Sequence, residues 1–107
     1  MGWYAIRTVY LFGVKSDDTN VFEERIVVFE ASSWSEALSK AHVESDEYVK
    51  HNGFVAHPEK IGYEQDGDKL IDGYEIWSEL FEHRSSLEEF YAMRYGQYEY
   101  RPEDFAP

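Results

Sequence analysis

The sequence predicts an α+β domain with a four-stranded antiparallel sheet. One long helix covers one face in the order β-β-α-β-β, and a short helix follows near the C-terminus. Runs of β-branched and aromatic residues separated by turn residues predict the strands. Two serine-to-glutamate capping boxes predict the starts of the helices. The chain has 107 residues, so we expect residues 1–107 to form a single domain.

Residues 3–12 and 21–31 are the first two predicted strands. The polar segment 13–20 between them is short and rich in turn residues, which predicts an antiparallel hairpin. Alternate residues of the first strand are largely apolar on both faces. Strands of this kind are usually covered on both sides, so we expect cover for both faces of the sheet.

The long helix is predicted to begin at Trp34. Ser33 and Glu36 form a capping box in front of it, and apolar residues recur at helical spacing as far as Val49. Gly53 is expected to end the helix, because glycine adopts the left-handed C′ conformation at little cost.

Residues 54–65 and 74–82 are the third and fourth predicted strands. Pro58 lacks an amide hydrogen, so the third strand is expected at a sheet edge. Asp66-Gly67 and Asp72-Gly73 are turn signals, and residues 68–71 between them are expected to form a loop.

A short helix is predicted from the capping box of Ser86 and Glu89 to about Tyr95. Residues 83–107 thus comprise this helix and an aromatic tail with Tyr98, Tyr100 and Phe105, which we expect to dock on the rest of the domain. The face of the sheet opposite the long helix must be covered by the short helix, by the tail or by a second subunit.

Composition excludes several classes of function. The net charge of −12 opposes binding to nucleic acid and to anionic membranes, and it suits either solubility or attraction to a basic partner. The chain has no cysteine, which is compatible with a reducing compartment, and we expect a cytoplasmic protein.

No metal or cofactor is expected. The four histidines lack metal-ligand spacing: His42, His51, His57 and His83.

The carboxylates of Glu23, Glu24 and Glu75 are the candidates for acid–base chemistry or cation binding. Glu23 and Glu24 point to opposite faces of one strand, so only one of them can meet Glu75 across the sheet, near Arg7 or Arg25. The alternative is a strand face that is solvated or paired with arginine.

Aromatic residues near the C-terminus are the candidates for an interface, because Tyr and Trp are common binding anchors. The alternative is a second small core in which the short helix packs on the sheet. The aromatic set consists of Trp77, Phe81, Phe90, Tyr91, Tyr95, Tyr98 and Tyr100. The candidate binding residues of the whole chain are Glu23, Glu24, Arg25, Glu75, Trp77, Tyr91 and Tyr95.

Four blocks of the sequence together carry a family resemblance. They are Trp3-Tyr4-Ala5-Ile6-Arg7, Glu23-Glu24-Arg25-Ile26-Val27-Val28-Phe29, Ser35-Glu36-Ala37 with Lys40-Ala41, and Asp72-Gly73-Tyr74-Glu75-Ile76-Trp77-Ser78. In this order they resemble the bacterial domain-of-unknown-function 4288 family. The resemblance covers about residues 3–80 and leaves 83–107 outside. It implies one compact domain and supplies no activity or site residues.

Three functions are compatible with these observations. The first is a non-catalytic protein-binding module, for instance an immunity or inhibitor protein that blocks a basic toxin such as a nuclease. The second is a homodimeric structural domain, indicated by strands that are apolar on both faces. The third is a small enzyme that uses Glu24 and Glu75 as acid and base, which requires at least one of them to be buried.

Overall fold

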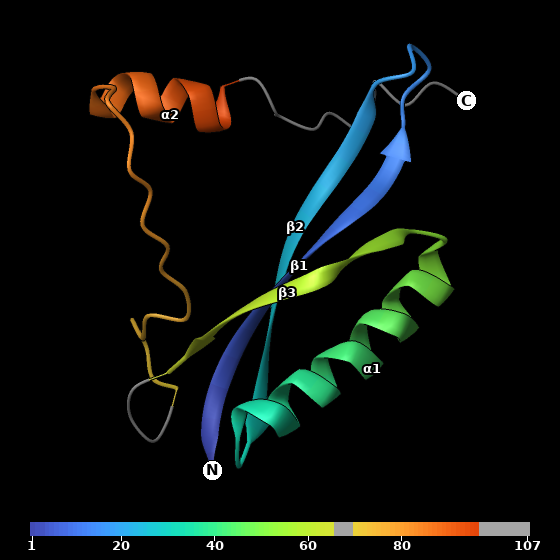
Figure 1. Ribbon diagram of the computed structural model, residues 1–107, viewed down its shortest axis with the longest axis vertical. Helices are drawn as coiled ribbons and strands as arrows, with labels where there is room; N and C mark the ends of the chain where they lie inside the picture. Colours follow the sequence, from blue (N-terminus) through green and yellow to red (C-terminus); the bar gives the residue numbers. More distant parts are fainter. Residues whose placement is uncertain (66–69, 97–107) are drawn as a thin grey trace.

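The computed structural model describes residues 1–65 and 70–96. Over these residues the chain forms three antiparallel strands and two helices (Figure 1). The central strand β1 pairs with β2 on one side and with β3 on the other. The elements are β1 (Gly2–Val14), β2 (Asn20–Ala31), α1 (Trp34–Asn52), β3 (Val55–Glu64) and α2 (Leu87–Tyr95). The predicted α+β class with an antiparallel sheet is therefore confirmed.

A tight turn joins β1 and β2 into the predicted hairpin. Asp18 adopts a left-handed conformation with φ of 68°, which aspartate tolerates better than most residues. The Oδ1 atom of Asp17 accepts the amide of Thr19 at 3.0 Å. The amide of Lys15 in turn donates to the Thr19 carbonyl at 2.8 Å. These bonds fix the chain reversal and with it the register of the two longest strands.

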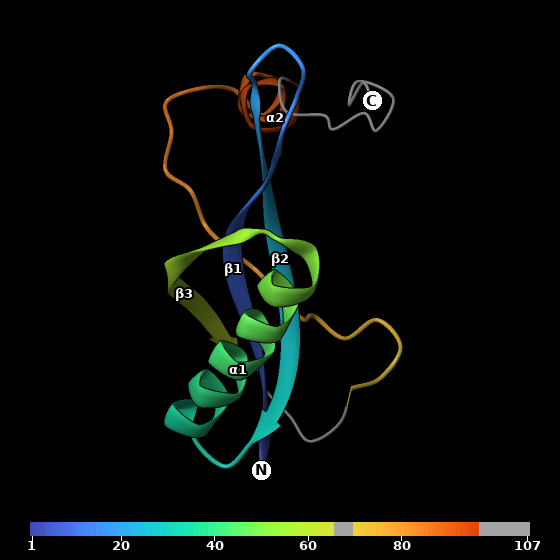
Figure 2. The same cartoon turned by 90° about the vertical axis from the view of Figure 1, so that its right-hand side faces the viewer.

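Helix α1 has both of its predicted caps. The Ser33 hydroxyl accepts the Glu36 amide at 3.1 Å, and Gly53 adopts φ of 71° while its amide donates to the Val49 carbonyl. Between these caps the helix lies along one face of the sheet, as Figure 2 shows. One long helix on one face is thus confirmed.

The core lies between α1 and the sheet. Small side chains on both sides, Ala31, Ala37 and Ala41, let the helix approach the strands closely. Gly62 of β3 has the same effect at the start of the helix, because the indole ring of Trp34 occupies the space that a Cβ atom there would need. Even-numbered residues of β1 fill the rest of this interface: Tyr4, Ile6, Thr8 and Tyr10 are all buried.

The predicted fourth strand is not confirmed, because residues 74–82 pair with no strand in the described part of the chain. Pro58 and the shift in register between Thr8 and Tyr10 lie toward the start of β3, whereas the segment contacts Tyr63 and Gln65 at the other end of the strand. Side-chain contacts instead hold the segment over the sheet face opposite α1. The predicted turn at Asp72-Gly73 is present, with the Tyr74 amide donating to the Ile71 carbonyl.

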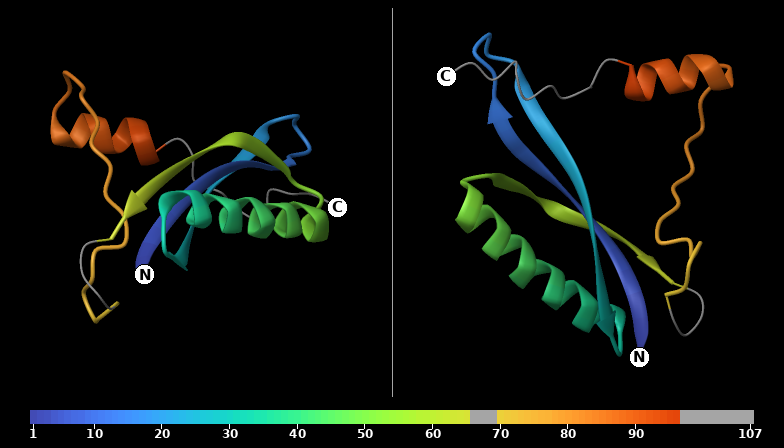
Figure 3. Two further views of the ribbon diagram at one scale, coloured as in Figure 1. Left: turned by 60° about the horizontal axis from the view of Figure 1, so that its bottom comes forward. Right: turned by 180° about the vertical axis from the view of Figure 1, so that it is seen from behind.

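Residues 70–96, which we call the C-terminal arm, contact the sheet through residues 76–79 and carry α2 at their far end. Figures 1 and 3 show α2 standing apart from the strands at the end of this arm. The radius of gyration is 16.4 Å, against about 13 Å for a compact domain of this length. Helix α2 buries none of its residues, so the alternative of a second small core, in which the short helix packs on the sheet, is not formed. The predicted features at 66–69 and 97–107, namely the Asp66-Gly67 turn and the aromatic tail, lie outside the described residues.

Candidate functional site

The register of the strands assigns the predicted site residues to two different faces. Thr8 pairs with Arg25 and Tyr10 with Glu23, so Arg25 and Glu23 share the face covered by α1. Val9 pairs with Glu24, which therefore lies on the opposite face. We call this opposite face the open face. It is formed by Trp3, Ala5, Arg7, Val9 and Leu11 of β1, Phe22, Glu24, Ile26, Val28 and Glu30 of β2, and Val55, Ile61 and Tyr63 of β3.

Under α1, Arg25 is held in a closed network. Its Nη1 and Nη2 atoms donate to the two carboxylate oxygens of Glu44 at 2.8 and 2.6 Å, and its guanidinium lies 3.7 Å from the ring centre of Tyr48. The Tyr48 hydroxyl donates to Glu23 at 2.7 Å. The hydrogen bonds to Glu44 raise the pKa of Arg25, which stays charged.

Neighbouring polar groups complete this network. Burial, reinforced by the Glu23 carboxylate, raises the pKa of Tyr48 to about 12. The Tyr10 hydroxyl and Ser45 are 2.9 Å apart, and the Lys60 ammonium donates to the Thr8 hydroxyl at 3.0 Å. Burial lowers the pKa of Lys60. The polar groups in this region bind one another, which indicates a role in holding α1 on the sheet.

On the open face, by contrast, large apolar side chains are exposed to solvent. Phe22 has 64% of its surface exposed and Val55 has 62%, while Ile61 and Ile26 have 46% and 39%. A sheet face in a folded domain is usually covered, so an exposed apolar surface of this kind indicates an interaction site.

One end of the C-terminal arm covers part of the open face. Arg7 donates through Nη1 to both carboxylate oxygens of Glu79, at 2.7 and 2.9 Å, and its guanidinium lies 5.8 Å from the ring centre of Trp77. The ring of Trp77 is 6.5 Å from that of Tyr63. The Gln65 amide group donates to the Ile76 carbonyl at 2.7 Å. Residues 76–79 of the arm are therefore anchored to the sheet.

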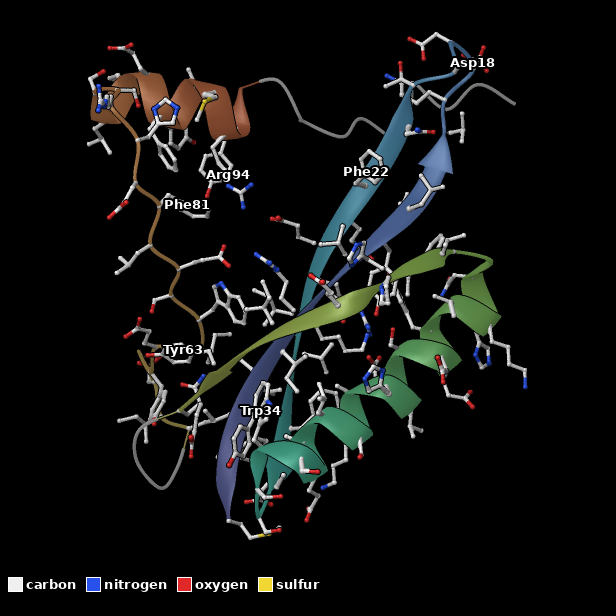
Figure 4. All side chains as sticks on the ribbon, viewed as in Figure 1. Asp18, Phe22, Trp34, Tyr63, Phe81 and Arg94 are labelled. Carbon is white, nitrogen blue, oxygen red and sulfur yellow. The ribbon has the colours of Figure 1, made fainter. Side chains whose placement is uncertain are left out.

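Among the described residues, one ion pair attaches the far end of the arm to the sheet. The Nη2 atom of Arg94 donates to Glu24 at 3.0 Å, and its guanidinium lies 5.1 Å from the ring centre of Phe81. Figure 4 shows Arg94 pointing from α2 toward Phe81. Phe81 and Phe90 contact each other at 5.6 Å. These contacts stay largely within the arm and leave most of α2 in solvent.

The structure does not bring the predicted site residues together in one place. Glu24 binds Arg94, whereas Glu75 is exposed and forms no hydrogen bond or ion pair with another described residue. The expected meeting of Glu75 with Glu23 or Glu24 across the sheet is therefore not formed. Trp77 is half-buried in the arm contact. Tyr91 and Tyr95 contact each other at 5.1 Å on the exposed surface of α2.

Sequence reasoning missed the partners that organise both faces. Glu44 lies 19 positions from Arg25, and Glu79 lies 72 positions from Arg7. No local spacing connects residues so far apart. In the described ranges, no group of three or more His, Asp or Glu side chains is arranged to hold a metal ion. Neither described helix has the length and apolar character to cross a bilayer.

Comparison with known proteins gives one match. The family model described as domain of unknown function (DUF4288) matches residues 3–87, which include β1, β2, α1, β3 and the arm as far as the start of α2. No curated protein and no solved structure matches the chain. The arm segment 74–82 thus lies within the matched region.

Proposed function

The chain belongs to the family of the domain of unknown function (DUF4288), and we propose that it is a non-catalytic protein-binding module whose open face binds a basic protein. The observation that carries this proposal is the exposed apolar surface of Phe22, Ile26, Val55 and Ile61 on that face. Such a surface costs solubility and is normally retained where a partner covers it.

Charge supports a basic partner. On the open face Arg7 is neutralised by Glu79 and Glu24 is paired with Arg94, while Glu30 keeps its negative charge. The whole chain has a net charge of −12. A field of this sign accelerates encounter with a positively charged protein and slows encounter with an acidic one. The apolar patch would then supply affinity, while the negative field of the whole chain supplies the attraction to a basic partner.

An inhibitor of a basic toxin, such as a nuclease, is the most specific form of this proposal. A nuclease surface that binds phosphates is positively charged, and an acidic protein can occupy it by imitating the charge of its substrate. We place this encounter in the cytoplasm, in keeping with a cysteine-free chain. A carboxylate enzyme receives less support, since Glu24 is engaged by Arg94 and Glu75 stands alone in solvent among the described residues.

The test uses three baits in a lysate of the native host. They are the unmodified chain, an open-face variant with Val55→Ala and Ile61→Ala, and a control with Leu87→Ala and Met93→Ala, which removes two exposed apolar side chains from α2. A specific basic partner binds the unmodified chain and the control. We expect its affinity for the open-face variant, measured with purified proteins, to fall about tenfold to a hundredfold.

Lysozyme serves as an unrelated basic protein in the same measurements. Non-specific attraction to charge would give equal lysozyme binding for all three baits and equal loss with added salt. The proposal fails if the captured partner is acidic, or if the open-face variant binds it as tightly as the control does.

A further inference from the structure

In the part of the chain that the structure describes, the outer edge of strand β2 pairs with no other strand. Residues of an antiparallel strand alternate in the side to which their N–H and C=O groups point. The backbone carbonyl of Trp3 accepts a hydrogen bond from the backbone amide of Gln65 on the β3 side. The backbone groups of odd-numbered residues of β1 therefore point toward β3, and those of even-numbered residues point toward β2. Tyr4 pairs with Phe29, so odd-numbered residues of β2 face β1. The backbone N–H and C=O groups of the even-numbered residues of β2 therefore point away from β1, toward the outer edge of the sheet. These residues are Phe22, Glu24, Ile26, Val28 and Glu30.

One side-chain contact supports this assignment. The Lys40 ammonium donates to the Glu30 carbonyl at 2.6 Å from outside the sheet. The backbone groups of Phe22, Glu24, Ile26 and Val28 that point outward have no hydrogen-bond partner in the described part of the chain. A row of free amides and carbonyls over this length is a template for another strand.

The two edges of the sheet differ in how they are protected. The edge at β3 contains Pro58 and an irregular register, both of which block strand addition. Within residues 22–31 the pairing of β2 with β1 is regular, and β2 contains neither proline nor lysine. Strand addition is therefore favoured at β2 over β3.

We propose that two copies of this chain pair along β2, antiparallel and centred on Ile26, into one continuous six-stranded sheet. In this register Ile26 lies opposite its own copy, Glu24 opposite the partner's Val28, and Phe22 opposite the partner's Glu30. All five outward residues then pair, and no carboxylate lies directly opposite another. The Glu30 carbonyl exchanges its bond with Lys40 for the amide of the partner's Phe22.

A groove beside the same edge provides apolar area for this dimer. It runs between α1 and β2 and is lined by Phe29, Ser39, Lys40, Val43 and Glu44. Val43 is largely exposed in the single chain. The two-fold axis would run perpendicular to the joined sheet, so both α1 helices lie on one side and both open faces on the other. The dimer proposal does not depend on the function proposed above, because it uses the strand edge.

Salt dependence separates this dimer from binding to a basic partner. Each copy carries a net charge of −12, so the copies repel each other and added salt should strengthen the dimer. Binding of a basic protein should weaken in the same series. Failure of the dimer proposal therefore leaves binding to a basic protein testable, and failure of that binding leaves the dimer testable.

The first experiment is sedimentation of the full chain at about 100 μM, in low salt and in about 0.5 M salt. We expect a species of twice the 12.6 kDa chain mass that increases with salt. Ile26→Lys places two ammonium groups opposite each other at the axis and should weaken the dimer about tenfold or more. Circular dichroism checks that this variant is folded. A chain that remains monomeric at both salt concentrations overturns the proposal.

The second experiment tests the register by disulfide formation. The chain has no cysteine, so a single introduced cysteine can cross-link only two copies. Ile26→Cys should give a covalent dimer on mild oxidation, because paired residues have a Cα separation that suits a disulfide. The matched control is Ile61→Cys, an isoleucine on β3 of the same face. A mixture of Glu24→Cys and Val28→Cys chains should form mainly the mixed dimer. Equal cross-linking of Ile26→Cys and Ile61→Cys, or no preference for the mixed dimer, refutes this register.

Discussion

The two faces of the sheet have similar residues but opposite environments. Ile6 and Ile61 are neighbours in the sheet, yet Ile6 is 2% exposed under α1 while Ile61 is 46% exposed on the open face. Each face also has an arginine anchored by a glutamate, Arg25 with Glu44 under the helix and Arg7 with Glu79 under the arm. The difference lies in the covering element: α1 contributes alanines that allow close packing, whereas the arm covers the sheet with few contacts.

This comparison shows that residue type alone does not identify a core. A strand that is apolar on both faces indicates that both faces must be covered. Which face is packed within the chain depends on the element that covers it. The side that lacks a well-packed cover is then the side available to a partner.

Replacing one isoleucine on each face with alanine should give the largest difference in stability between the two faces. Ile6→Ala leaves a cavity between α1 and the sheet, and we expect the free energy of unfolding to fall by about 2–5 kcal/mol. Ile61→Ala removes a side chain that is half in solvent, and the expected loss is below about 1 kcal/mol. Urea denaturation of both variants measures the difference. Equal losses would mean that the arm packs on the open face as tightly as α1 packs on the other.

A methyl group at Gly62 should have the next largest effect. The indole of Trp34 lies where the new Cβ atom of Gly62→Ala must go, so the ring has to move away from the strand. We expect a loss of about 1–3 kcal/mol in the free energy of unfolding. In a Trp34→Ala background the space is empty, and the same substitution should cost little. A full cost in both backgrounds would place the strain in the backbone of β3.

How much of this arrangement was predictable depends on the range of the interactions. The capping bonds of Ser33 and Ser86, the turn at Gly73 and the edge position of Pro58 are local features, and the sequence predicts each of them. The segment 74–82 has strand-like alternation as well, but a strand needs a partner edge. Local propensity does not contain that information, so the fourth strand was predicted where none is paired.

The candidate site illustrates the same limit. That Glu23 and Glu24 lie on opposite faces follows from the alternation of a strand, and the structure agrees. The partners of these residues, Tyr48 and Arg94, come from helices 25 and 70 positions away. The exposure of the open face depends on how the arm docks, which is a tertiary property.

The hydrogen bond between Tyr48 and Glu23 should make part of the stability depend on pH. At pH 8, Tyr48→Phe should lower the free energy of unfolding by about 1 kcal/mol, the usual contribution of a hydrogen bond. The pKa of Tyr48 is raised to about 12, chiefly by burial and then by Glu23. In the unfolded chain the tyrosine ionises near its ordinary value of 10.0. The stabilising contribution is therefore complete below about pH 10 and is lost as the pH rises toward 12.

Urea denaturation at a series of pH values tests this expectation. The difference between the unmodified chain and Tyr48→Phe should shrink between pH 10 and 12. In a Glu23→Gln background the carboxylate no longer opposes ionisation, so the dependence on pH should be weaker. A difference that stays constant from pH 8 to 12 would contradict the raised pKa of Tyr48, and an unchanged pH dependence in the Glu23→Gln background would contradict the contribution of Glu23.

The smallest effect on stability is expected at the far end of the arm. Arg94 and Glu24 are joined mainly through one nitrogen in a partly exposed position, and pairs of this kind contribute little. Arg94→Gln should change the free energy of unfolding by less than about 0.5 kcal/mol. Hydrogen exchange of residues 84–96 should nevertheless become faster, because this ion pair joins α2 to the sheet. Glu44→Gln is the matched control, since it breaks the bidentate pair of Arg25 and should cost more global stability without affecting exchange in the arm. An arm whose exchange is unchanged in Arg94→Gln must be held by other contacts, and the open face would then be less accessible to a partner than its exposed side chains indicate.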